Sequence, residues 1–196
     1  MHCIALRCVS ALVEQGYLDK ARTEWYVYAI ERRLGYCLAG VWLIAVAFVL
    51  HAPLQTALFF GSAVFLRART GGWHAKSVGG CQLLSMLTTL VVVWAVGAIP
   101  APLRMPISAV VLPVCIAIVW HLAPINHANI HLTQKECDAN RVLSRYRAVL
   151  LCVLCGVLHL MAPQSALGLS VTAGIAVASA GIVMGHFIKE DISNES

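Results

Sequence analysis

A histidine and a cysteine lie seven positions apart in a glycine-rich, basic stretch of an otherwise apolar chain. The stretch, Arg67–Gln82, reads RARTGGWHAKSVGGCQ and contains His74 and Cys81. A cysteine thiolate can attack a carbonyl carbon, and an imidazole can remove the thiol proton and later protonate the leaving amine. The pair predicts a nucleophilic dyad. The alternative is a polar hairpin tip with an incidental histidine and a buried thiol.

The surroundings of Cys81 favour a reactive thiol. It follows Gly79-Gly80 and begins an apolar run, and the start of a helix carries partial positive charge and unpaired N–H groups that stabilise a thiolate. The pair Gly71-Gly72, like Gly79-Gly80, is expected to leave backbone N–H groups accessible for an oxyanion hole. Gln82 and Ser85 could each donate a hydrogen bond, but packing is the expected role of both.

No acidic residue lies between Arg67 and Cys81, so the group that orients His74 is not visible in this stretch. Asn126, Asn129 and Asp138 from a later polar segment are the candidates, and the sequence does not choose among them.

The composition indicates an integral membrane protein. Of 196 residues, 60% are hydrophobic and 12% are charged, whereas soluble domains devote about a quarter of their residues to charge. Mean hydropathy is +0.79. A single integral membrane domain over residues 1–196 is predicted, an all-α polytopic bundle of about six transmembrane helices. The six apolar runs are Gly35–Leu50, Leu54–Leu66, Leu83–Ile99, Ile107–Ala123, Ala148–Ala162 and Ser165–Ile188. The second and fifth runs are shorter than the roughly 20 residues that a membrane-spanning helix needs. The alternative for the first two runs is one shallow hairpin.

Charge predicts the orientation in the membrane. Thirteen of the fourteen Lys and Arg residues fall in the N-terminal segment, in two alternate loops (67–81 and 121–147) and in the C-terminal tail, and only Arg104 falls on the other side. Cationic loops remain in the cytoplasm. Both termini and the His74–Cys81 stretch are therefore expected to face the cytoplasm of a cell (plasma) membrane.

The two ends of the chain have their own patterns. Residues 1–33 repeat apolar pairs at nearly helical spacing, which predicts an amphipathic helix that lies in the membrane interface or packs on the bundle. In the last apolar run Ser170, Gly174 and Ala178 form a stripe of small residues, and Gly181 and Gly185 continue it. Such a face contacts another helix closely, either internally or in a homodimer; a possible homodimer is the prediction that follows.

Two further patterns of cysteines and histidines could support redox or metal chemistry. Cys152 and Cys155 form a CxxC, but within an apolar helix they are expected to pack, and a thiol-based redox protein is the competing hypothesis. His127 and His131 have the spacing of a zinc pair, yet no complete set of four ligands accompanies them. We expect no metal site.

One family combines these features. The pattern Arg67-x3-Gly71-Gly72-x-His74-Ala75-x5-Cys81 resembles the signature of the accessory gene regulator protein B (AgrB) family, membrane cysteine endopeptidases that process quorum-sensing peptide precursors. The segment Ala123–Asn129 is similar to a second family stretch, with Ala128 in place of the expected proline. Chain length, the amphipathic N-terminus and the six apolar runs agree with this resemblance.

The resemblance implies a thiol protease in which Cys81 is the nucleophile and His74 its base, supported by Arg67, Gly71 and Gly72. It implies as substrate a precursor peptide with an amphipathic leader, a core containing Cys or Ser and an acidic C-terminal tail. Removal of the tail through a thioester would let the core cyclise to a thiolactone or lactone signal. This mechanism requires no cofactor, and its partners are the peptide and membrane lipid; no nucleic-acid partner is expected.

The basic loops could hold the acidic tail. The residues proposed for this contact are Arg69, Lys76, Lys135 and Arg141. Membrane orientation alone also explains their charge, so both interpretations stay open. The leading alternative function is a small transporter or channel-like bundle without covalent catalysis, although the spans offer few polar residues for a permeation path.

Overall fold

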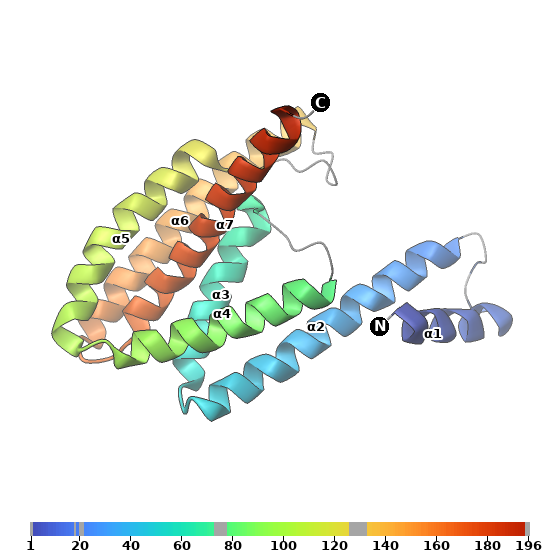
Figure 1. Cartoon of the computed structure of the whole chain (residues 1–196), viewed down its shortest axis with the longest axis horizontal. Helices are drawn as coiled ribbons and strands as arrows, with labels where there is room; N and C mark the ends of the chain where they lie inside the picture. Colours follow the sequence, from blue (N-terminus) through green and yellow to red (C-terminus); the bar gives the residue numbers. More distant parts are fainter. Residues whose placement is uncertain (1, 18, 20–21, 73–77, 126–132, 195–196) are drawn as a thin grey trace.

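Long helices account for nearly all of the chain. The computed structural model describes residues 2–17, 19, 22–72, 78–125 and 133–194, and these residues form seven helices without a strand (Figure 1). The helices are α1 (His2–Glu14), α2 (Thr23–Val49), α3 (Pro53–Thr70), α4 (Val78–Ala98), α5 (Ala101–Leu122), α6 (Gln134–Met161) and α7 (Leu167–Asn194). The predicted all-α membrane bundle is confirmed.

Five of these helices are long and apolar enough to cross a membrane: α2, α4, α5, α6 and α7. The expected sixth span, Leu54–Leu66, forms most of α3. This helix has 18 residues and carries Arg67 and Arg69 in its last turn, so it is not apolar enough over its length to join the five among the described residues. It nevertheless packs against α6 and α7. The second apolar run is therefore a helix of the bundle rather than half of a shallow hairpin lying outside it.

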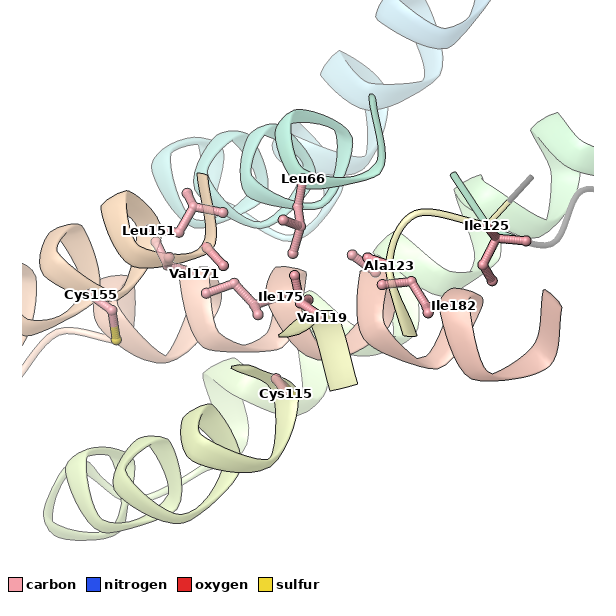
Figure 2. Packing of buried hydrophobic residues seen from close by; sticks show 12 residues of the cluster. Leu66, Cys115, Val119, Ala123, Ile125, Leu151, Cys155, Val171, Ile175 and Ile182 are labelled. Atoms are coloured by element: carbon pink, nitrogen blue, oxygen red, sulfur yellow. The ribbon is translucent and has the colours of Figure 1, made fainter. Parts of the chain in front are cut away.

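The last helix, α7, forms the centre of the bundle. It packs against α3, α4, α5 and α6. Of its apolar membrane-spanning stretch, 56% is buried, compared with 17% to 28% of the corresponding stretches in the other four candidate spans. Figure 2 shows its side chains among those of the surrounding helices. The labelled residues of this core are Leu66, Cys115, Val119, Ala123, Ile125, Leu151, Cys155, Val171, Ile175 and Ile182.

The small-residue stripe of α7 is used inside the chain. Ser170, Gly174 and Ala178 are all buried, and the backbone of α3 lies directly against Gly174. A Cβ atom added at Gly174 would lie 2.5 Å from the carbonyl oxygen of Phe59 and would also overlap the hydroxyl of Ser62. This face therefore makes an internal contact between α3 and α7. The homodimer stays a prediction, but the stripe of small residues no longer supports it.

The remaining helices extend away from this core. α2 packs along α4, and both diverge from the α3, α5, α6 and α7 group toward the N-terminal end of the molecule (Figure 1). The predicted N-terminal helix is present as α1, and it packs on the first turns of α2 through Ala5, Val9 and Val27. This contact is with the start of α2 rather than with the bundle, so the two expected placements, in the membrane interface or on the bundle, stay predictions.

Both predicted loops are shorter than expected. α3 continues to Thr70 and α4 begins at Val78, while α6 begins at Gln134, inside the predicted 121–147 loop. The early start of α6 has a local cause. Thr133 and Glu136 form a capping box, in which the Thr133 amide donates to Glu136 Oε2 at 2.9 Å and the Glu136 amide donates to Thr133 Oγ1 at 3.4 Å.

Candidate functional site

A glycine loop ends α3 at the cation-rich end of the bundle. Gly71 has φ 69° and its N–H donates to the carbonyl oxygen of Arg67 at 3.1 Å, which closes the last turn of the helix. Gly72 has φ 138°, a conformation that side-chain-bearing residues rarely adopt. The two glycines therefore turn the chain sharply toward the His74-containing segment.

Gly72 lies against the backbone of α7. A Cβ atom added at Gly72 would be 3.2 Å from the carbonyl carbon and oxygen of Gly181, and 3.7 Å from a guanidinium nitrogen of Arg67. A Cβ atom added at Gly181 would in turn be 3.8 Å from the Arg67 guanidinium carbon. Arg67, Gly72 and Gly181 thus form one packed unit, in which the backbone of Gly181 leaves little room for a side chain at position 72.

The second motif segment joins the same unit. The amide of Ile125 donates to the carbonyl oxygen of Thr70 at 3.0 Å, and a Cβ atom added at Gly71 would lie 3.0 Å from the Ile125 carbonyl oxygen. Ala123 and Ile125 are buried beside Ile182 of α7, as Figure 2 shows. Two loops that are 50 residues apart in sequence therefore meet through their backbones, and the structure brings Arg67, Gly71 and Gly72 together with the start of the Ala123–Asn129 segment.

Cys81 occupies the first turn of α4, as the sequence predicts, and is half-buried and outside any disulfide. Its neighbour Gln82 fixes this end of the helix on α2. The Gln82 side-chain amide donates to the carbonyl oxygen of Gly35 at 3.1 Å and accepts a hydrogen bond from Trp42 Nε1 at 3.0 Å. Gln82 therefore ties the turn that contains Cys81 to α2 through hydrogen bonds, which is the alternative to the packing role that the sequence favoured for it.

The base of the predicted dyad, His74, and the basic residue Lys76 lie outside the described residues, as do Asn126, Asn129, His127 and His131. The segment that contains His74 is short. Six residue steps connect Gly72 to Val78, and a fully extended chain spans at most about 20 Å over that number of steps.

The hydrogen bonds of the glycine loop limit which backbone N–H groups could donate to an oxyanion. The Gly71 N–H already donates to Arg67, so it does not serve as the oxyanion donor that sequence analysis expected from this pair. The first four N–H groups of any helix lack acceptors within the helix, and Cys81 lies in such a turn of α4. Of the two glycine pairs considered from the sequence, Gly79-Gly80 at the start of α4 stays a candidate source of donors, whereas a donor role of the Gly71 N–H is not supported.

The basic residues proposed to hold an acidic tail are distributed over α3 and α6. Arg69 donates to Asn140 Oδ1 at 3.1 Å across these helices. Lys135 is exposed on the first turn of α6, and Arg141 lies 4.0 Å from Asp138 in an exposed pair of the kind that contributes little to stability. Asp138 is thus engaged with Arg141.

Three other thiols, Cys115, Cys152 and Cys155, lie in packing environments. Cys155 is buried, 3.3 Å from the carbonyl oxygen of Gly168 and 3.2 Å from Thr172 Oγ1, while Cys115 belongs to the core and Cys152 packs at its edge. These contacts agree with structural roles for the CxxC. Among the described residues no group of three His, Cys, Asp or Glu side chains could hold a metal ion.

His159, the intramembrane histidine that a transport path could use, is also engaged by its neighbours. Its Nε2 lies 2.9 Å from Ser108 Oγ, which accepts a hydrogen bond from Thr172 Oγ1 at 2.9 Å. A Cβ atom added at Gly168 would lie 2.6 Å from the His159 ring, so the histidine fills the space that this glycine leaves. The network joins α5, α6 and α7 and fits a packing role.

Sequence analysis missed the site roles of Thr70, Ile125 and Gly181. The spacing of Gly181 and Gly185 predicts a closely packed helix face, internal or in a homodimer, but spacing does not say which backbone comes close. No sequence signal points to the Thr70–Ile125 hydrogen bond, because both partners use main-chain atoms.

Comparison with known proteins agrees with this arrangement. The family model described as "AgrB: Accessory gene regulator B" matches residues 5–184, which include the glycine loop, Cys81, the Ala123–Ile125 segment and Gly181. No curated protein and no solved structure gives a significant match. Proteins of this family process autoinducer peptides in accessory gene regulator systems. Since the match covers nearly the whole chain, this multi-pass membrane protein belongs to the accessory gene regulator B family.

Proposed function

We propose that this protein is a membrane cysteine endopeptidase that removes the C-terminal tail of an autoinducer precursor peptide and leaves the remaining fragment on Cys81 as a thioester. The observation that carries the proposal is the position of Cys81. It lies in the first turn of α4 and is connected, through the short segment that contains His74, to a glycine loop held by α7. A helix start favours the thiolate form of a cysteine.

The first step forms one bond and breaks another. His74 accepts the proton of the Cys81 thiol as the sulfur attacks the scissile carbonyl carbon, and N–H groups at the start of α4 stabilise the oxyanion. The carbon–nitrogen bond then breaks, and the imidazolium returns the proton to the amine of the departing tail.

The second step closes the ring. A Cys thiol or Ser hydroxyl of the peptide core loses its proton to His74 and attacks the thioester, which yields a thiolactone or lactone and restores the Cys81 thiol. An attacking group on the same peptide has a high effective concentration, so it competes well with water. Of the four basic residues that the sequence suggested for the acidic tail, Lys76, Lys135 and Arg141 are candidates to hold it during the first step, and Arg69 is assigned to a different anion below.

Trapping the thioester tests the mechanism. A precursor whose core Cys or Ser is changed to Ala should be cut but not cyclised, so that intact-mass analysis finds the enzyme heavier by the N-terminal fragment, on Cys81, in a form labile to hydroxylamine. Cys81→Ala should abolish cleavage and His74→Ala should slow it by about 10²–10⁴-fold, whereas Cys115→Ala and Cys152→Ala should leave substantial activity. Normal removal of the tail by the Cys81→Ala enzyme would refute the proposal.

The same proposal places both termini and the active site in the cytoplasm, because the cations concentrate at that end. In a variant without Cys3, Cys8 and Cys37, a membrane-impermeant thiol reagent should label Leu103→Cys in intact cells but should label Lys76→Cys only after the membrane is opened. The reverse pattern would invert the topology.

A further inference from the structure

Two arginines come together where α3 and α6 meet at the cation-rich end. Arg147 of α6 donates to the carbonyl oxygen of Phe65 at 2.6 Å, and its guanidinium carbon lies 4.4 Å from the centroid of the Phe65 ring. Arg69 follows Phe65 by one helical turn and is held by Asn140 of α6 at 3.1 Å. Each guanidinium is thus fixed in direction by one neutral acceptor.

The pair has positive charge without an acidic partner. The charges of Arg69 and Arg147 repel one another, and within the described ranges neither side chain forms an ion pair with a carboxylate. A guanidinium carries five N–H donors, and one hydrogen bond from each arginine to a neutral acceptor leaves most of these donors available. An anion that bridges the two groups would relieve the repulsion and accept from both.

Apolar, outward-facing residues continue from each arginine along its helix. On α3, Gly61, Phe65 and Arg69 follow one another at four-residue spacing, and Gly61 and Phe65 are exposed. On α6, Leu150 and Leu154 lie three and seven residues beyond Arg147 and are exposed as well. Residues at these spacings share a helix face, so each arginine lies at the cation-rich end of an exposed apolar face of its helix. A Cβ atom added at Gly61 would meet no other atom within 4 Å, so this strip is open.

We propose that Arg69 and Arg147 bind the phosphate of an anionic phospholipid at the membrane surface, with its acyl chains along the exposed faces of α3 and α6. Basic residues between helices at the membrane surface are a known way of holding such headgroups. A lipid accounts for both halves of the feature, since it supplies the anion for the arginines and the hydrocarbon for Phe65, Leu150 and Leu154. An acidic peptide would supply only the anion. This inference does not depend on the cleavage chemistry at Cys81.

Native mass spectrometry of the full-length protein in detergent tests this site. We expect phosphatidylglycerol to bind at least tenfold more tightly than phosphatidylcholine, since each interfacial cation contributes roughly fivefold in affinity. The Arg69→Gln/Arg147→Gln variant should lose this preference. The charge-matched control, Arg22→Gln/Arg33→Gln, removes two exposed arginines near the start of α2 and should keep it.

A second variant separates lipid binding from misfolding. Because Arg147 also contacts Phe65, the glutamine variant removes a packing contact together with the charge. Arg69→Lys/Arg147→Lys keeps the charge and should keep most of the preference for phosphatidylglycerol. Equal binding of the two lipids by the unmodified protein, or the same loss in the lysine and glutamine variants, would overturn the proposal.

Two competitors distinguish the source of the anion. Glycerophosphoglycerol, the headgroup without acyl chains, should compete poorly; competition as strong as that of the lipid would refute the role of the apolar faces. A glutamate-rich peptide should not displace phosphatidylglycerol. Displacement that depends on Arg69 and Arg147 would assign the pair to a peptide and overturn the lipid assignment.

Discussion

The two sides of the candidate site are held by different parts of the molecule. Arg67, Gly71 and Gly72 belong to the end of α3, which rests on α7 at Gly181 and on the chain after α5 at Ile125. Cys81 instead belongs to α4, whose first turn is tied to α2 by Gln82. The glycine loop is thus built into the best-buried part of the bundle, whereas Cys81 lies on one of a pair of helices, α2 and α4, that diverge from it (Figure 1).

We therefore expect the stability of the fold and the position of Cys81 to depend on different contacts. The far end of α4 packs on α7, where Val96 contacts Ala166 and Leu169. The helix that carries Cys81 is therefore fixed to the bundle at one end and to α2 at the other. Changes in the α3–α7 contact should lower stability and activity together, but changes at Gln82 should affect mainly where Cys81 lies.

The largest effect is expected at the α3–α7 contact. In Gly174→Ala the new methyl group would meet backbone atoms of α3, with Phe59 O at 2.5 Å and Ala63 N at 3.1 Å. Backbone cannot swing aside as a flexible side chain can, so the helices must separate. Overpacking typically costs about 1–3 kcal/mol, occasionally more, and we expect the upper end of that range, seen as a clear drop in melting temperature in detergent and loss of cleavage.

Gly61→Ala is the matched control on α3, because its Cβ would meet nothing within 4 Å. Alanine favours a helix over glycine by about 1 kcal/mol in model helices, so this variant should melt no earlier than the unmodified protein. If both substitutions change the melting temperature equally, the close α3–α7 contact does not stabilise the fold.

The second effect concerns the two glycine pairs around His74. Gly72→Ala would place a side chain at φ 138° and 3.2 Å from the Gly181 backbone, and Gly71→Ala would place one at φ 69° and 3.0 Å from Ile125 O. Such backbone strain costs about 1–3 kcal/mol, and relief by a shift of the loop would move His74. We expect cleavage to slow by about 10–100-fold, measured as the rate of tail release.

Gly79 provides the comparison for this loop. It lies in the first turn of α4, and a Cβ atom there would meet nothing within 4 Å. Gly79→Ala should therefore cleave at close to the normal rate. A strong defect in Gly79→Ala with normal activity in Gly72→Ala would reverse the assignment of structural roles between the two pairs.

The sequence predicted those features that depend on local chemistry. The Gly71-Gly72 pair marks the end of α3, and Cys81 lies in the first turn of α4, although Gly79-Gly80 belongs to that turn and does not precede it. Apolar runs identify the helices but not their bounds, because Arg67 and Arg69 extend α3 beyond its apolar part and α4 and α6 begin well before theirs.

Features that depend on tertiary contacts were not predictable in the same way. The stripe Ser170, Gly174 and Ala178 correctly indicated close packing, but small residues suit an internal helix and a second subunit equally. Likewise the match of Gly71 to Ile125 uses main-chain atoms, which every residue type has. Only the fold identifies these partners.

The smallest effect is expected at Gln82, and it tests directly whether α2 positions the nucleophile. Gln82→Leu keeps the approximate size of the side chain but leaves the Trp42 Nε1–H and the Gly35 carbonyl without their present partner. An unsatisfied buried polar group costs about 1–3 kcal/mol, and part of that cost is relieved if the first turn of α4 moves. We expect tail release to slow by about tenfold through kcat with little change in KM, while the melting temperature falls less than in Gly174→Ala.

Ser85→Ala is the control, one turn further along α4. The Ser85 carbonyl oxygen accepts a hydrogen bond from Thr89 Oγ1 at 2.8 Å, and this contact is retained in the variant because it uses the main chain of Ser85. If Gln82→Leu lowered the melting temperature and the cleavage rate in the same proportion as Gly174→Ala, α2 would be an ordinary part of the fold, and the separation between a stabilising core and a positioning arm would be wrong.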